Sequence, residues 1–143
     1  MSGPCLIMGN MEGLGFSVTL DEGFEKAEAR TREALKAEGF GIISEIDIKA
    51  VLKEKIDADF HPYTILGACN PHLAKKALDA APEVGLLLPC NVTVEQVDGG
   101  TRVTAIDPIV MLDVIGENPA IKEVAEDARP RLMRAIASLE SND

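Results

Sequence analysis

Aromatic side chains are scarce in this chain, which has four Phe, one Tyr and no Trp among 143 residues. Proteins that bind single-stranded nucleic acid without sequence preference stack bases on such side chains. Basic residues are also outnumbered, because 14 Lys and Arg face 24 Asp and Glu, for a formal net charge of −10. That charge repels phosphate backbones and anionic lipid surfaces. We therefore expect no nucleic-acid partner and no membrane partner.

Long apolar runs are missing as well. No stretch approaches the roughly 20 apolar residues that span a bilayer, and residues 1–8 lack the basic flank of a signal peptide. Three cysteines, at positions 5, 69 and 90, are too few and odd in number for the disulfide framework of a small secreted domain. These absences predict a cytoplasmic protein.

The familiar catalytic motifs are also absent. The chain has no phosphate-binding loop with a Gly-Lys-Ser/Thr end, and Met11–Gly15 is too poor in glycine for a dinucleotide fingerprint. It has no Gly-x-Ser-x-Gly elbow. With only two histidines, His61 and His72, a His-based triad has few options. The sequence therefore leaves open whether the protein is an enzyme.

What is present suits one globular domain. A length of 143 residues fits a single domain, and 46% apolar residues suffice for an aliphatic core. Residues 1–14 carry Gly, Pro and Asn without a period, so we expect a flexible head there and a single domain over 15–143.

Hydrophobic periodicity predicts the elements of that domain. The expected strands are 16–20, 41–48, 63–69, 91–97 and 101–107, the last two forming a hairpin. The expected helices are 24–38, 49–55, 71–81, 109–114 and 119–139, with 84–88 a buried strand or a helix tail. Because a hairpin mixes with helices without strict βαβ alternation, we predict an α+β two-layer sandwich with a mostly antiparallel sheet packed against helices.

Helix ends carry their own signals. A capping residue precedes a proline at Asn70–Pro71, Asp107–Pro108 and Asn118–Pro119, which predicts three helix starts. Asp21 is expected to cap the first helix in the same way. Pro130 lies inside the last helical pattern, so a kink or break is expected there.

Cys69 is the first candidate for chemistry. If Asn70 caps a helix, Cys69 lies just outside its N-terminus, where the positive end of the helix dipole favours a thiolate nucleophile. The alternative, which spacing alone favours, is a small apolar residue that fills the strand end.

Cys69 and His72 also have the spacing of two ligands for one soft or borderline metal ion. Cys90 would complete the set only if the fold brings it near, and His61 is a further option. A structural zinc site needs about four ligands, so the cofactor stays open, with a soft metal ion as one candidate.

Cys90 follows an apolar run and precedes a strand, so Cys69 and Cys90 could lie on neighbouring strand ends. They would then form a redox pair or two thiolate ligands. Asn70 and Asn91 each follow one of these cysteines and could hydrogen-bond a ligand, although a cap or turn role suits them as well.

Residues 39–55, 63–71 and 85–94, together with Ala105–Pro108 and the final helix, resemble domain-of-unknown-function family 302. The resemblance extends from about residue 15 to residue 139. It implies an antiparallel sheet against helices and a homodimer, but no assigned activity. The matching motifs include Cys69, Asn70, Pro71, Cys90 and Asn91, without a known role for any of them.

Three functions follow as hypotheses. The first is binding of a small ligand or soft metal near Cys69 and Cys90. The second is a thiol-based redox or sulfur-transfer enzyme with Cys69 as nucleophile. The third is a dimeric interaction module in which the cysteines only pack.

Overall fold

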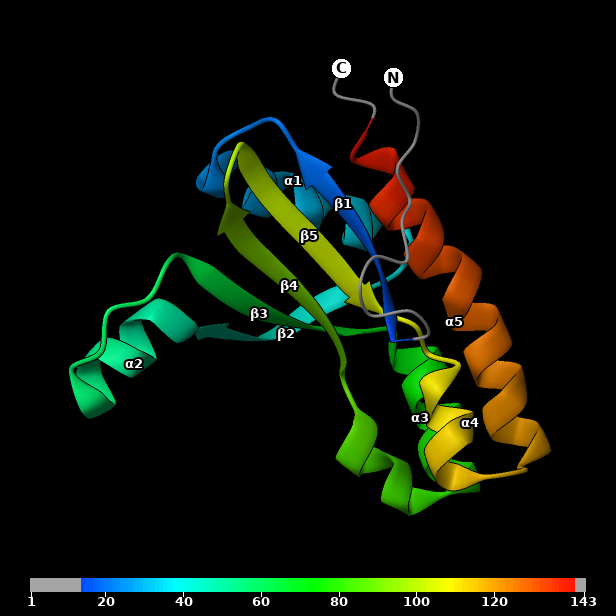
Figure 1. Ribbon diagram of the computed structural model, residues 1–143. Coiled ribbons are helices and arrows are strands. Elements are labelled where there is room, and N and C mark those ends of the chain that lie inside the picture. Colours follow the sequence, from blue (N-terminus) through cyan, green and yellow to red (C-terminus); the bar gives the residue numbers. More distant parts are fainter. Residues whose placement is uncertain (1–13, 141–143) are drawn as a thin grey trace.

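A five-stranded antiparallel sheet forms the centre of the protein, and the computed structural model describes residues 14–140 (Figure 1). The strand order is β1-β5-β4-β3-β2. The strands are β1 (Gly15–Leu20), β2 (Gly41–Asp47), β3 (Tyr63–Cys69), β4 (Cys90–Val97) and β5 (Gly100–Ile106). All five strands predicted from the sequence are therefore present, and the hairpin is β4–β5.

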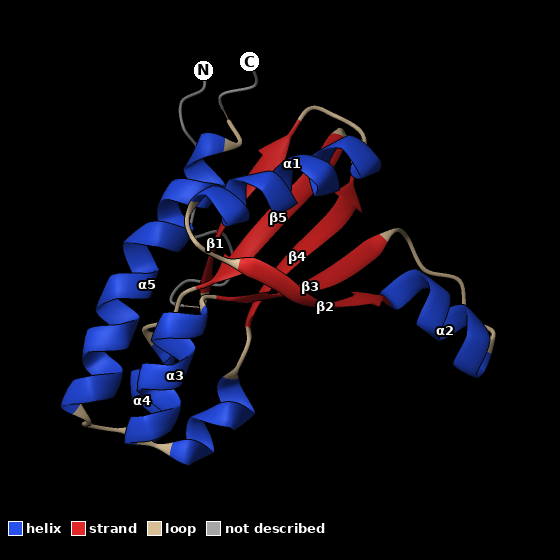
Figure 2. Cartoon of the chain, turned by 180° about the vertical axis from the view of Figure 1, so that it is seen from behind, coloured by secondary structure: helices blue, strands red, loops and turns tan. Residues whose placement is uncertain are grey.

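The described residues also form five α-helices, only some of which cover a face of this sheet (Figure 2). They are α1 (Phe24–Ala37), α2 (Ile48–Ile56), α3 (Pro71–Ala80), α4 (Val110–Ile115) and α5 (Pro119–Ser138), with a 3₁₀ helix, η1, at Pro82–Leu87. α1 and α5 pack on the sheet, whereas α3, α4 and η1 gather around the other half of α5. The α+β fold predicted from the sequence is confirmed.

One face of the sheet is buried and the other is exposed, because apolar and polar residues alternate along its strands. In β1, Phe16, Val18 and Leu20 are buried beneath the helices, while Thr19 is exposed. This alternation is what a half-buried strand requires. One core lies between the sheet, α1 and α5, and a second lies among α3, η1, α4 and α5.

Two of the predicted caps have the expected geometry. Asn70 accepts hydrogen bonds from the amides of α3, and Asn118 accepts from the amides of Ala120 and Ile121 at the start of α5. The third prediction is wrong, because the residue before α4 is Ile109 and no side chain caps that helix; the carboxylate of Asp107 instead accepts from the Ile109 amide at 3.0 Å in the preceding turn. Side chains that satisfy these otherwise unpaired amides define where the helices begin.

Asp21 does not cap a helix, which corrects the sequence prediction. The residue before α1 is Gly23, and no side chain caps this helix. The chain bends at residues 21–22, so the helix begins only at Phe24. Gly39, with φ of 89°, follows the end of this helix in the left-handed conformation that glycine adopts readily.

Pro130 does not break α5, which runs from Pro119 to Ser138. A proline inside a helix costs about 3 kcal/mol. Pro130 lies on the exposed side, while Ala128 and Leu132 beside it are buried in the core. The packing of this buried face outweighs the lost backbone hydrogen bond.

Residues 84–88 do not form a strand. They belong largely to the 3₁₀ helix η1, in which Val84 is buried and Leu86 is 89% exposed. An apolar run is therefore split here between core and surface. No helix among residues 14–140 is long and apolar enough to cross a membrane.

Candidate functional site

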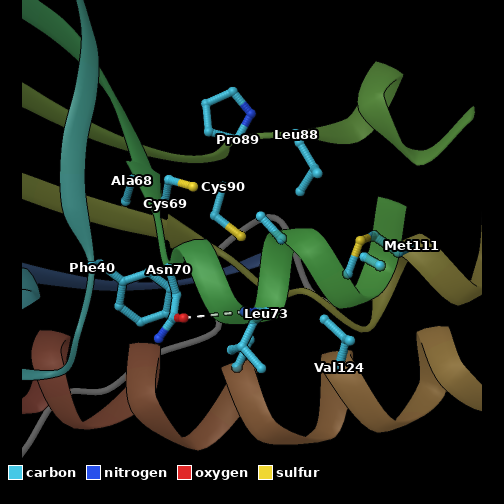
Figure 3. Close-up of a pocket in the computed structure, with 13 residues that line it drawn as sticks. Phe40, Ala68, Cys69, Asn70, Leu73, Leu88, Pro89, Cys90, Met111 and Val124 are labelled. Atoms are coloured by element: carbon cyan, nitrogen blue, oxygen red, sulfur yellow. Dashed lines mark hydrogen bonds between the residues drawn. The ribbon is translucent and has the colours of Figure 1, made fainter. Parts of the chain in front are cut away.

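Cys69 and Cys90 lie on adjacent strands at one end of the sheet. β3 ends at Cys69, β4 begins at Cys90, and the register of the two strands pairs Ala68 with Cys90. Figure 3 shows the two side chains next to each other, with Pro89 beside them. Neither cysteine is in a disulfide.

The two cysteines line a small cavity of about 30 Å³. A cavity needs roughly 10–15 Å³ on this scale to hold one water molecule, so it has room for about two water-sized groups. Its other walls are almost wholly apolar and come from β3, α3, α4, α5 and the residues just before β2 and just after η1, including Phe40, Leu73, Leu88, Met111 and Val124. The thiols are therefore the main reactive groups that face this space.

Asn70 also lines the cavity, but its carbonyl oxygen is already used. Oδ1 accepts from the amides of His72 at 3.1 Å and Leu73 at 3.2 Å. Its role is to start α3, whose first turn forms one wall of the cavity (Figure 3). Asn91 is exposed on β4 and lines a separate cleft on the outer side of Cys90.

The backbone beside Cys69 is closely packed against its neighbours. A Cβ atom added to Gly67 would lie 2.1 Å from Ser44 Oγ and 2.7 Å from Pro89 Cγ. Only glycine therefore allows β2 and the residue before Cys90 to approach this point of β3. The contact holds Pro89 over the strand that carries Cys69.

Burial raises the pKa of the Cys90 thiol to about 11, and the nearby Cys69 adds to that rise. Removing water from around the sulfur disfavours its charged form. Without a bound cation, Cys90 is therefore a neutral thiol at pH 7, which argues against it as a free nucleophile.

This shift predicts a loss of stability at high pH. An unfolded Cys ionises near pH 8.5–9, whereas Cys90 in the folded chain keeps its proton up to about pH 11. The unfolded state therefore loses its proton first, and the unfolding free energy should fall by about 1–3 kcal/mol between pH 9 and 11. We expect Cys90→Ala to reduce this slope in urea titrations at successive pH values, and Cys69→Ala, which removes only the smaller cause of the raised pKa of Cys90, to reduce it less. An unchanged slope in the Cys90 variant would contradict the assignment.

The histidines do not join the two thiols in a metal centre. His72 is exposed on α3 and does not line the cavity. His61 pairs with Glu95 at 2.9 Å and stacks on Phe60, on the loop before β3. Over residues 14–140, no three His, Cys, Asp or Glu side chains converge to hold a metal ion. The three-ligand set of Cys69, His72 and Cys90 is thus not assembled in this structure.

Met111 is a cavity residue that sequence reasoning missed. It lies on α4, and its side chain lines the cavity (Figure 3). Its helix was predicted, but α4 reaches the site only by packing against η1 and α5. No local pattern could have placed it next to Cys90 and Cys69, which lie 21 and 42 residues earlier in the chain.

A second, larger cleft opens on the other side of Cys90. Its volume is about 220 Å³, and Leu88, Pro89, Cys90 and Met111 line both spaces. The remaining walls are Leu86, Leu87, Asn91, Ile106, Pro108 and Val110. Cys90 therefore stands between a small inner cavity and an open apolar cleft, which we call the outer cleft.

Comparison with known proteins gives a family and a related structure. The family model described as "Domain of unknown function DUF302" matches residues 16–139. A crystal structure of an uncharacterized conserved protein DUF302 from Bacillus stearothermophilus is 33% identical in sequence, with a TM-score of 0.77. The match covers 85% of this chain and 94% of that chain. No curated protein matches the sequence.

Proposed function

The chain belongs to the DUF302 family, which brings no assigned activity, and from the geometry of the cavity we propose that it binds a soft metal ion of the Cu(I) class through Cys69 and Cys90. The observation that carries this proposal is the meeting of two free cysteines at one small, otherwise apolar cavity. We further propose that the protein is cytoplasmic, because thiols stay reduced in the cytoplasm and the site needs two reduced cysteines.

The ligand type selects the class of metal. Thiolate sulfur prefers soft cations such as Cu(I) over hard cations such as Mg²⁺ or Ca²⁺. Zinc requires about four protein ligands in a structural site, and no three His, Cys, Asp or Glu side chains converge within residues 14–140. A cation that accepts two sulfur ligands therefore fits the pair best.

The chemistry of the apolar walls agrees with this assignment. A lone thiolate is disfavoured in the cavity, as the high pKa of Cys90 shows. A bound cation supplies the opposite charge that a buried thiolate needs, so the Cys90 thiol should lose its proton only when the metal binds. Cys90 then carries no charge while the site is empty.

The test is a titration of the Cys5→Ala variant, in which Cys69 and Cys90 are the only thiols left. We expect one equivalent of Cu(I) per chain, measured without oxygen by native mass spectrometry and by competition with a coloured Cu(I) chelator. Zn²⁺ added in the same way serves as the comparison cation. Failure to retain Cu(I), or tighter retention of Zn²⁺, would rule out the proposal.

We also propose that the protein is a homodimer, because one part of the molecule lacks a packing partner. Residues 41–60, which we call the β2–α2 arm, contain the edge strand β2 and the helix α2. α2 buries no residue, and it stands off from the body of the molecule in Figure 1. The exposed apolar side chains of the arm are Ile43, Ile46, Val51, Ile56 and Phe60. A nine-residue helix is marginal without packing, so a second copy covering the arm would account for it.

Sedimentation velocity tests the dimer. We expect Ile56→Lys, at a side chain that is 68% exposed, to shift the protein from dimer to monomer, because a buried charge opposes association. Val114→Lys is the matched control, since Val114 is 67% exposed on α4, outside the arm. A monomeric parent protein, or equal dissociation by both variants, would refute the assignment.

A further inference from the structure

The outer cleft is an apolar surface that residues 14–140 leave uncovered. Its walls carry one polar side chain other than the Cys90 thiol, the amide of Asn91. Leu86 at its rim is 89% exposed. A cavity of about 150 Å³ holds a benzene molecule, so about 220 Å³ accommodates one or two aliphatic side chains.

The chain enters the described structure beside this cleft. Gly15, the first residue of β1, pairs with Ile106, and the Asp107 amide donates to the Leu14 carbonyl at 2.8 Å. Ile106 and Pro108 are themselves walls of the cleft. The residues that precede Leu14 therefore start at its edge.

The preceding residues include a short apolar stretch of suitable size. Residues 5–8 are Cys-Leu-Ile-Met, and position 5 lies nine positions before position 14. Extended chain covers about 3.3 Å per residue, so this length reaches roughly 30 Å. Gly15 and Asn91 are two strand spacings apart across β5, or about 10 Å. The stretch can therefore reach every wall of the cleft.

We infer that Cys5–Met8 occupies the outer cleft, with Leu6 and Ile7 against its apolar walls and the Cys5 thiol beside Cys90. This placement covers the exposed Leu86 and accounts for a cleft that continues up to a cysteine. The docking itself does not depend on any metal.

Disulfide trapping tests the docking. In a chain with Cys69→Ala, Cys90→Ala and Asn91→Cys, the thiol introduced on the cleft wall should link to Cys5 under oxidised glutathione. We expect this link within one chain. Peptide mass spectrometry of mixed ¹⁵N-labelled and unlabelled protein distinguishes it from a link between two chains. Val114→Cys in place of Asn91→Cys is the control, because Val114 is exposed but outside the cleft, and it should link far more slowly. Equal rates, or links only between chains, would overturn the inference, the latter in favour of a second copy.

Dye binding provides an independent measurement. Deletion of residues 2–10 should uncover the cleft and raise the fluorescence of anilinonaphthalene sulfonate, which binds exposed apolar surface. Leu6→Ser with Ile7→Ser should act in the same direction, whereas Glu12→Gln should not. If the full chain and the deletion bind the dye equally, the cleft is open to free small molecules and the inference fails. Loss of Cu(I) binding in the Cys5→Ala variant would instead overturn the proposed function and leave the docking standing.

Discussion

Replacing Cys90 with alanine is expected to lower the affinity for Cu(I) by more than 100-fold in the Cys5→Ala background. Even outer-shell residues of metal sites contribute about 10–100-fold to affinity, and Cys90 would be one of only two ligands. The remaining thiol, Cys69, cannot by itself hold a cation against a competing chelator. Competition titrations of the variant and its parent measure the difference directly.

The control for this experiment is Met111→Leu. Met111 lines the same cavity and carries the remaining sulfur atom among its walls. Leucine conserves the volume of methionine at a cost below about 1.5 kcal/mol, so this variant removes a soft atom with little change in packing. We expect its Cu(I) affinity to stay within a few-fold of the parent. A loss as large as that of Cys90→Ala would show that the thioether is a ligand as well, and would contradict a site made of the two thiols alone.

Gly67→Ala is expected to destabilise the protein by about 2–3 kcal/mol, because overpacking a closely packed site usually costs 1–3 kcal/mol. The new Cβ would lie 2.1 Å from Ser44 Oγ and 2.7 Å from Pro89 Cγ, so β2 and Pro89 must both move. Since Pro89 is next to Cys90, the same change should weaken Cu(I) binding. Urea unfolding measures the first effect, and chelator competition measures the second.

Two further variants separate this steric effect from the loss of glycine flexibility. Gly41→Ala is the matched control, because Gly41 lies on the neighbouring strand and a Cβ there meets no atom within 4 Å. Ser44→Gly should partly rescue Gly67→Ala, since it removes the nearer of the two clashing groups. Equal effects of Gly41→Ala and Gly67→Ala would refute the steric explanation.

Much of the fold could be predicted because its signals are local. Alternation in residues 91–97 and 101–107 encoded the hairpin, and the Asn70–Pro71 and Asn118–Pro119 pairs marked two helix starts that the structure confirms. A cap involves neighbouring backbone amides only, so its signal survives in the sequence.

The errors share a physical cause, which is packing between distant segments. Pro130 is tolerated because the buried face of α5 holds the helix together. Residues 84–87 belong to a 3₁₀ helix, in which Val84 is buried in the core and Leu86 is exposed. An apolar run does not reveal which of its members the rest of the chain will cover.

The sequence by itself determined the α+β class, the order of the elements and the candidate thiols Cys69, Cys90 and Cys5. Only the tertiary structure decided that two of those thiols share a cavity, because β3 and β4 pair in a register that sets Ala68 opposite Cys90. It likewise left His72 exposed, brought Met111 to the cavity wall and opened a cleft beside the start of β1. Strand register and helix packing join residues far apart in the chain, and no local pattern records those contacts.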